Sequence, residues 1–236
     1  MGQVPHYLVI GNGRVARHVL RYFSLSDIAH SHWHRGMDAA ALRGLAQNAT
    51  HTLLLVSDGA IADVAALLGD ADVMKVHFSG ALSTDAAYGA HPLMTFGPDL
   101  YTLEKYKTIP FVVDDDAPDF STLLPGFSNP HTYLPRAQKG RYHAMCVMAA
   151  NYSCILWQRF FSVLEHEFGM PPETGHPFLQ QQTENLLRDH VNALTGPLAR
   201  GDEKTIAKNL EGLADDPYRR IYEAFVTVYK EEHEKP

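Results

Sequence analysis

Polar and apolar positions divide this chain into two parts. In the first part, strand-like segments alternate with helical patterns. The strand-like segments cover residues 7–10, 28–34, 51–57, 73–78, 109–113 and 132–134. The helical patterns cover residues 14–23, 37–47 and 58–68, with a short one that starts at 118. Because strands that alternate with helices are typical of βαβ units, this part predicts a doubly wound parallel sheet.

From residue 139 onward only helical patterns remain. The first covers residues 139–168 and is stopped by Gly169-Met170-Pro171-Pro172. The others cover residues 177–194, 205–213 and 217–232. We therefore predict an α/β domain over residues 1–136 and an all-helical domain over residues 137–236.

The long predicted helix is apolar on nearly every side over residues 144–157. Such a helix has to be buried on more than one face, and one small helical domain offers too little cover for it. A homodimer that buries this segment against its symmetry mate is the simplest solution, so the helical domain is predicted to be a dimerisation domain.

A glycine-rich turn, Gly11-Asn12-Gly13-Arg14-Val15-Ala16, joins the first predicted strand to the first predicted helix. The spacing G-x-G-x-x-A in this context is the dinucleotide-binding pattern of a Rossmann fold. The first glycine permits the tight turn, the second lets backbone approach a pyrophosphate, and the helix N-terminus favours the anion. A glycine turn in any other α/β protein is the alternative.

In a doubly wound sheet, ligands bind at the carboxyl ends of the strands. Combining the glycine turn with the ends of the second and third strands gives the predicted cofactor contacts. They are Gly11, Asn12, Gly13, Arg14, Val15, His34, Arg35, Ser57 and Asp58.

The end of the second strand decides which dinucleotide fits. An acidic residue there would bind the ribose 2′-hydroxyl of NAD, but this chain has His34 and Arg35, and no acid before Asp38. A cation at this point suits a 2′-phosphate, so the sequence favours NADP over NAD. A solvated surface arginine is the alternative.

Candidate catalytic groups follow the fourth strand. His77 and Ser79 come where a nicotinamide ring should end, and a histidine can serve as a general acid or base. His91 begins a segment that follows a glycine-containing loop and is predicted to close over the same pocket. Asn151, with His143 near the same face, is the strongly polar side chain in the apolar helix. For His77, a loop histidine bonded to backbone is the alternative.

Three alternating histidines, His30, His32 and His34, raise the question of zinc. No cysteine or carboxylate of matching spacing follows, so no metal site is predicted. The two cysteines, Cys146 and Cys154, are predicted to be reduced core thiols rather than a disulfide.

Composition narrows the partners. The 236 residues carry a formal net charge of −7, which argues against nucleic acid or an anionic membrane. No signal peptide is visible, and the longest nearly apolar run is too short to span a bilayer. A cytoplasmic protein that acts on a small molecule is expected.

Five segments together resemble a known family. They are Gly11-Asn12-Gly13-Arg14-Val15-Ala16, His77-Phe78-Ser79-Gly80-Ala81, His91-Pro92-Leu93-Met94-Thr95-Phe96, Asn151, and Asn192-Ala193-Leu194-Thr195-Gly196-Pro197-Leu198-Ala199-Arg200-Gly201-Asp202. The chain resembles Rossmann-like proteins with a C-terminal helical domain of unknown function, which are relatives of pyrroline-5-carboxylate reductase and 6-phosphogluconate dehydrogenase. Through His91-Pro92 it is also similar to prephenate dehydrogenases, although its second domain is short for that activity.

The resemblance implies an NADP-binding Rossmann domain, a helical dimerisation domain and an active cleft between them. It leads to a hypothesis of an NADP-dependent oxidoreductase that passes hydride between nicotinamide and a small, anionic carbonyl, imine or hydroxy compound. A non-catalytic NADP sensor and an interaction module are the alternatives. The histidine-rich second strand and the irregular segment 114–135 depart from the family pattern.

Overall fold

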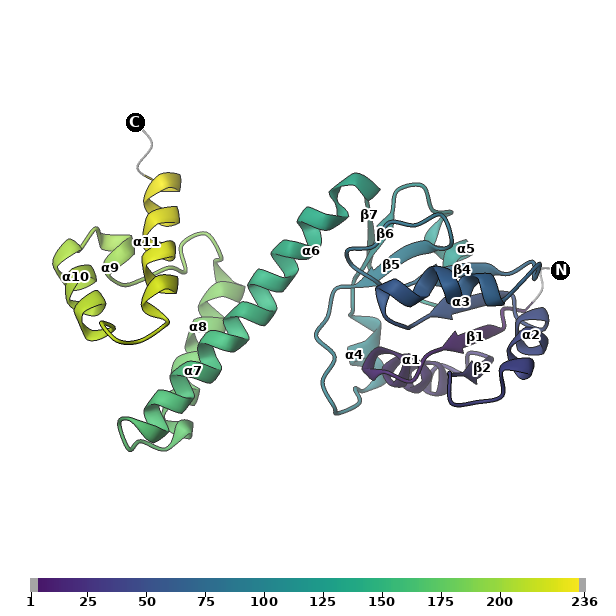
Figure 1. Cartoon of the computed structure of the whole chain (residues 1–236), viewed down its shortest axis with the longest axis horizontal. Coiled ribbons are helices and arrows are strands. Elements are labelled where there is room, and N and C mark those ends of the chain that lie inside the picture. The colour runs from purple at the N-terminus through teal and green to yellow at the C-terminus, as the bar shows by residue number, and fades with distance from the viewer. Residues whose placement is uncertain (1–3, 234–236) are drawn as a thin grey trace. The chain divides into compact units, whose positions relative to one another are not determined.

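The computed structural model describes residues 4–233 of the chain. It contains two compact units, one ending at Ile155 and the other beginning at Leu156. The first unit includes the sheet and the start of the long helix, and the second is built from helices (Figure 1).

Seven strands form one sheet in the first unit (Figure 1). They are β1 (Tyr7–Ile10), β2 (His30–Trp33), β3 (His51–Leu54), β4 (Met74–His77), β5 (Tyr88–Pro92), β6 (Phe111–Asp114) and β7 (His131–Leu134). Their order is β2-β1-β3-β4-β5-β6-β7. The β5–β6 pair is antiparallel and the other neighbouring pairs are parallel, which confirms the doubly wound Rossmann sheet.

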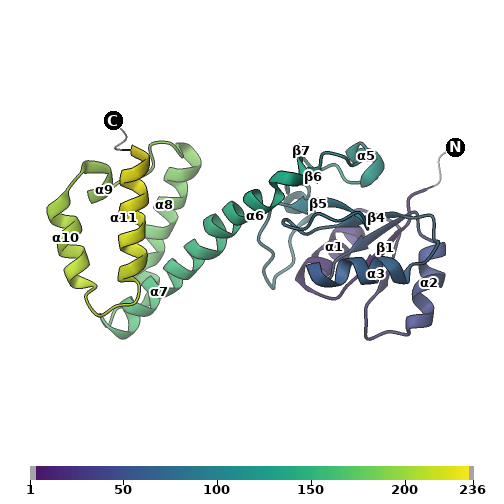
Figure 2. The same ribbon diagram turned by 45° about the horizontal axis from the view of Figure 1, so that its top comes forward.

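Helices cover both faces of this sheet (Figure 2). One face packs against α1 (Arg14–Leu25), α4 (Leu103–Lys107) and α5 (Phe120–Leu123), and the other against α2 (Ala39–Gln47) and α3 (Ile61–Leu67). A short 3₁₀ turn, Asp58–Ala60, precedes α3. Strand β1 is buried along its whole length because alternate side chains enter the two cores.

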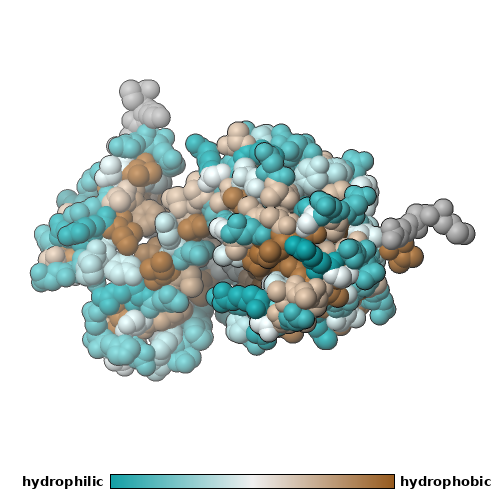
Figure 3. Space-filling model, turned by 45° about the vertical axis from the view of Figure 1, so that its right-hand side comes forward, coloured by the Kyte–Doolittle hydropathy of each residue, from teal (hydrophilic) through white to brown (hydrophobic). Residues whose placement is uncertain are grey.

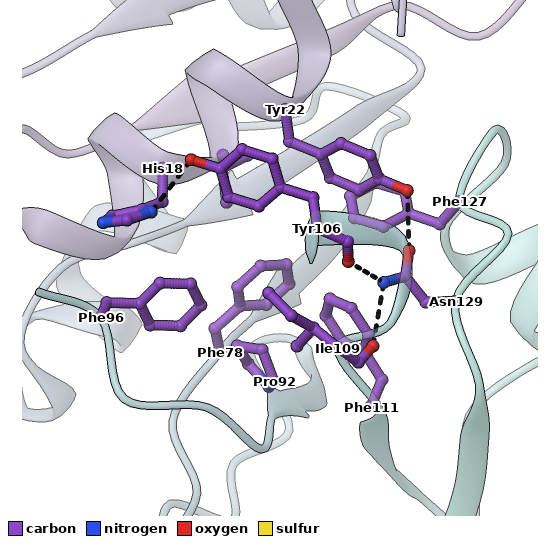
Figure 4. Close-up of a pocket in the computed structure, with 11 residues that line it drawn as sticks. His18, Tyr22, Phe78, Pro92, Phe96, Tyr106, Ile109, Phe111, Phe127 and Asn129 are labelled. Atoms are coloured by element: carbon purple, nitrogen blue, oxygen red, sulfur yellow. Dashed lines mark hydrogen bonds between the residues drawn. The ribbon is translucent and has the colours of Figure 1, made fainter. Parts of the chain in front are cut away.

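An aromatic pocket lies in the core beneath α1 (Figure 4). Its void is about 20 Å³, which is close to the room one water needs. The polar groups around it already have partners: His18 bonds the Tyr106 hydroxyl and the Gly97 carbonyl, each at 3.0 Å, and the Tyr22 hydroxyl donates to Asn129. The pocket therefore serves packing.

The long helix is present, with one irregularity. It consists of α6 (Lys139–Val147), a π-helical turn (Met148–Tyr152) and α7 (Ser153–His166). At the turn, the Ser153 hydroxyl donates to the carbonyls of Ala149 and Ala150. π-turns of this kind are frequent at functional sites, and this one contains Asn151.

The second unit contains the rest of α7 and the helices that follow. They are a 3₁₀ turn (Pro172–Gly175), α8 (His176–Arg188), α9 (Pro197–Arg200), α10 (Glu203–Gly212) and α11 (Arg219–His233). Aromatic rings join α7 to α8, with the rings of Trp157 and Phe178 5.6 Å apart. Helix α8 ends before the predicted residue 194, because Asp189 accepts from the amides of Val191 and Asn192 and closes the turn.

Apolar side chains remain exposed on both units. In the first unit they include Met145, Met148, Tyr152 and Ile155 on the long helix. In the helical unit, exposed apolar side chains lie among polar ones (Figure 3).

Both cysteines are free. Cys154 is exposed, because the helix face that carries it is uncovered in one chain. The prediction of a core thiol is therefore wrong for Cys154. Among the described residues, we find no helix with the length and apolar character to cross a membrane.

Candidate functional site

A cleft of about 980 Å³ opens at the carboxyl ends of strands β1 to β4. It is lined by the glycine turn, the residues after β2 and β3, and Phe78 and Ser79 after β4. The lining includes all nine predicted cofactor contacts: Gly11, Asn12, Gly13, Arg14, Val15, His34, Arg35, Ser57 and Asp58. Four separate segments of the sequence therefore meet at one cleft.

Gly11 is fixed in a conformation that favours glycine. Its φ is +135°, and a Cβ at this position would overlap the Leu55 carbonyl. Its N–H donates to the Trp33 carbonyl at 2.9 Å, and its own carbonyl accepts from His32 Nε2 at 2.6 Å. Strand β2 thus holds both backbone groups of Gly11, which keeps the turn in place without a ligand.

The start of α1 is open for an anion. Gly13 is its N-cap residue and supplies no side-chain cap. A Cβ at Gly13 would meet none of the described atoms within 4 Å. The first N–H groups of a helix lack partners within the helix, so this end fits a pyrophosphate.

The far end of the cleft is basic. Arg14, His34 and Arg35 line it, and the Gly36 N–H donates to His34 Nδ1 at 3.2 Å. Asp38, the next acid along the chain after Arg35, accepts from the Ala40 N–H at the start of α2 and is not among the lining residues. At this end, the segment after β2 therefore contributes an imidazole and a guanidinium to the lining and no carboxylate.

Ser79 and Asp58 close the opposite end. The Ser79 hydroxyl donates to Asp58 Oδ2 at 2.8 Å and accepts from the N–H groups of Ala81 and Leu82. These bonds occupy the hydroxyl, so Ser79 fixes the Asp58 carboxylate and the loop after β4.

His77 lies beneath the cleft and does not line it. Its side chain is 0% exposed, and its Nδ1 accepts from the Ser79 N–H at 3.2 Å. Burial, with a smaller contribution from Lys139, lowers its pKa to about 4. The imidazole is therefore neutral near pH 7 and out of reach of a ligand in the cleft, because strand alternation turns it to the interior.

His91 belongs to strand β5, a strand that the sequence did not predict. Pairing with β4 and β6 holds the segment extended despite Gly89 and Pro92. His91 Nδ1 shares a 2.8 Å hydrogen bond with the Tyr142 hydroxyl of α6. Burial first, and His143 second, lower the pKa of His91 to about 4.

Asn151 is exposed in the π-turn, and the structure does not bring it into the cleft lining. Of the four predicted catalytic residues, the cleft lining therefore contains Ser79.

Sequence reasoning missed a buried ion pair beside His77. Lys139 Nζ lies 2.6 Å from Asp114 Oδ1, and both side chains are almost fully buried. Asp114 also accepts from the Gly89 N–H at 2.7 Å. The pair joins residues 25 positions apart in two different elements, and no local pattern signals such a contact.

Across residues 4–233, no three histidine, cysteine, aspartate or glutamate side chains gather as metal ligands would. The β2 histidines bind backbone instead, with His30 on the Ile28 carbonyl and His32 on the Gly11 carbonyl.

Comparison with known families gives a match to the domain of unknown function DUF2520 over residues 111–228. The matched segment is half of the 236-residue chain and includes β6, β7 and the helices up to α11. The chain belongs to the DUF2520 family. A search of curated proteins finds no significant match.

Solved structures share the fold over nearly the whole chain. A protein from Bacteroides fragilis, provisionally assigned as an NADP oxidoreductase, has a TM-score of 0.77 at 20% identity, covering 96% of this chain and 98% of its own. A Thermotoga maritima protein gives 0.68 at 23% identity, with 95% and 97% covered. Pyrroline carboxylate reductase of Plasmodium falciparum, with NADP bound, gives 0.62 at 9% identity, with 97% and 96% covered. These matches confirm a Rossmann fold followed by helices.

Proposed function

We propose that the chain is an NADP-dependent oxidoreductase acting on a small carbonyl, imine or hydroxy compound. The observation that carries this proposal is the cleft itself, in which nine residues from the ends of three strands surround one space of about 980 Å³. The similarity to the NADP oxidoreductase and the NADP-bound reductase named above supports it.

Each part of the dinucleotide has a matching group of lining residues. The turn from Gly11 to Val15 would hold the pyrophosphate, Arg35 and His34 the 2′-phosphate, and Ser57 and Asp58 the nicotinamide half. The bound nicotinamide supplies a hydride donor or acceptor, while the protein orients the substrate and excludes water. NAD is the less favoured cofactor.

Cofactor preference is the first test. Because Arg35 forms part of the cleft and Asp38 is engaged at α2, NADPH should bind about tenfold more tightly than NADH. Arg35→Asp should abolish that preference, whereas Arg43→Asp on α2, outside the lining, should leave it unchanged. Calorimetric titration measures both. Equal affinities in the wild type would refute the assignment.

A non-catalytic NADP sensor or interaction module is the second candidate, since fold alone does not specify chemistry. It is favoured by the placement of His77 and Asn151 outside the cleft lining. Screening small ketones, keto acids and cyclic imines for NADPH oxidation distinguishes the two. Tight NADPH binding with no turnover on any compound would favour the sensor.

The contacts of the four predicted catalytic residues suggest new roles for them. We infer that Ser79 positions the Asp58 carboxylate and that His77 supports the loop after β4 through the Ser79 N–H. We also infer that His91, which is hydrogen-bonded to Tyr142, lies closer to the substrate than His77 does. Asn151 remains a candidate for substrate contact from the π-turn. We also propose a cytoplasmic protein, which the two free cysteines support.

We also propose a homodimer. Met145, Met148, Tyr152 and Ile155 are exposed and spaced by three, four and three residues, which places them on one helix face. Light scattering after gel filtration should give about twice the mass of one chain, and Met148→Glu should give the monomer. A wild-type monomer at micromolar concentration would contradict the proposal.

A further inference from the structure

The lining of the cleft carries opposite charges at its two ends. The basic lining residues come from the turn after β1 and the segment after β2, whereas the residues that line the cleft after β3 and β4 include one carboxylate, Asp58, and no cation. Strands β2 and β4 are three places apart in the sheet order, which is roughly 14 Å at about 4.8 Å per strand. The Debye length at physiological salt is about 8 Å, so the basic end does little to cancel the charge of Asp58.

Ser79 holds the Asp58 carboxylate in place. The Ser79 hydroxyl donates to Asp58 Oδ2 at 2.8 Å, and the N–H groups of Ala81 and Leu82 donate to the hydroxyl oxygen at 3.3 and 3.0 Å. Because a hydroxyl is neutral, this bond orients the carboxylate without removing its charge. The backbone of Asp58 is set by the 3₁₀ turn that it begins. The cleft therefore has a negative charge at a fixed position.

The cations of the described residues leave Asp58 without an ion pair. Its charge raises the pKa of His77 and of His91, but burial is the largest effect on both and lowers each pKa to about 4. Both imidazoles are therefore neutral near pH 7. Lys139 and Arg136, whose charges also reach His77, form ion pairs with other carboxylates and do not line the cleft.

The proposed function brings the nicotinamide half of the cofactor to this end of the cleft. NADP⁺ and NADPH have the same pyrophosphate and the same 2′-phosphate, so the basic end treats the two forms alike. They differ at the nicotinamide ring, which is positively charged in NADP⁺ and neutral in NADPH. A nearby carboxylate attracts the charged ring and has no such attraction for the neutral one.

Resting on the function proposed above, we propose that Asp58, held by Ser79, makes the cleft select the oxidised cofactor, NADP⁺, over NADPH. Stabilising the oxidised ring favours substrate reduction over substrate oxidation, because that ring is what remains after a hydride has passed to a substrate. In this direction the substrate carbon gains the hydride with its two electrons, and the substrate oxygen or nitrogen takes a proton from water. This narrows the proposed reaction to the reduction of a carbonyl or imine compound.

Calorimetric titration of the full chain with NADP⁺ and with NADPH tests the inference through the ratio of the two dissociation constants. Asp58→Asn removes the charge but keeps an oxygen that can accept from the Ser79 hydroxyl. It should reduce the preference for NADP⁺ about fivefold, which is the effect of one pair of unit charges a few ångströms apart in water. Asp63→Asn is the matched control, because it removes a charge from α3 outside the lining, and it should change the ratio less than about twofold.

Salt provides a second measurement on the wild type, and it decides the matter if Asp58→Asn does not fold. Raising the salt concentration from about 50 mM to about 500 mM should reduce the wild-type preference for NADP⁺, since the attraction is screened. A ratio that neither salt nor Asp58→Asn lowers would overturn the inference. A purely structural role of Asp58 at the start of α3 would give that result, because it affects both forms equally. Failure of the wild type to bind either form would overturn the proposed function and this inference with it.

Discussion

Gly11→Ala is expected to reduce NADPH affinity by at least about tenfold and to destabilise the first unit. Alanine disfavours the φ of +135° at this position, and its Cβ would overlap the Leu55 carbonyl. The backbone must move, which breaks the bonds of Gly11 with Trp33 and His32. Strain and overpacking of this kind each cost roughly 1–3 kcal/mol. Calorimetry and thermal unfolding measure the two effects.

Gly13→Ala separates binding from folding. Its added Cβ has room among the described residues, but it enters the cleft where a pyrophosphate would approach. We expect a similar loss of NADPH affinity with the free energy of unfolding changed by less than about 1 kcal/mol. If Gly13→Ala binds NADPH as the wild type does, the pyrophosphate does not lie against this turn.

Asp114→Asn is expected to lower the free energy of unfolding by about 3–5 kcal/mol, because it leaves the Lys139 ammonium buried without a carboxylate. Asp116→Asn is the control. Asp116 is half exposed in its ion pair with Arg136, and such pairs contribute about 0–1 kcal/mol.

Chemical denaturation of both variants measures this difference. A double variant, Asp114→Leu with Lys139→Met, should recover part of the loss, since it removes both charges together. Equal costs for Asp114→Asn and Asp116→Asn would contradict the role of the buried pair.

The sheet was predictable because parallel strands buried on both faces leave continuous apolar runs, as in residues 51–57. Strand β5 was not predicted. Its sequence, Tyr88-Gly89-Ala90-His91-Pro92, contains a glycine and a proline, and its extended form depends on pairing with β4 and β6. Pairing between distant segments leaves no local pattern.

The candidate site was predictable in part for a similar reason. The carboxyl ends of parallel strands lie at one edge of the sheet, so listing those ends was enough to name nine residues of one cleft. The direction of each side chain was not predictable. His77 ends its strand where expected, but a shift of one residue decides whether a strand side chain faces inward or outward, and this one is buried.

Contacts across long separations were also beyond local patterns. His143 contacts Gly80 because the Lys139–Asp114 pair fixes the start of α6. Both members of this pair are buried charges, whereas lysine and aspartate are usually surface residues, so the sequence alone does not indicate the pair.

A crystal structure of the protein grown with NADPH tests the proposed cofactor site most directly. We expect the pyrophosphate at the turn from Gly11 to Val15, with the 2′-phosphate beside Arg35 and His34 and the nicotinamide half toward Asp58. A dinucleotide bound elsewhere, or a cleft that stays empty at saturating NADPH, would contradict it.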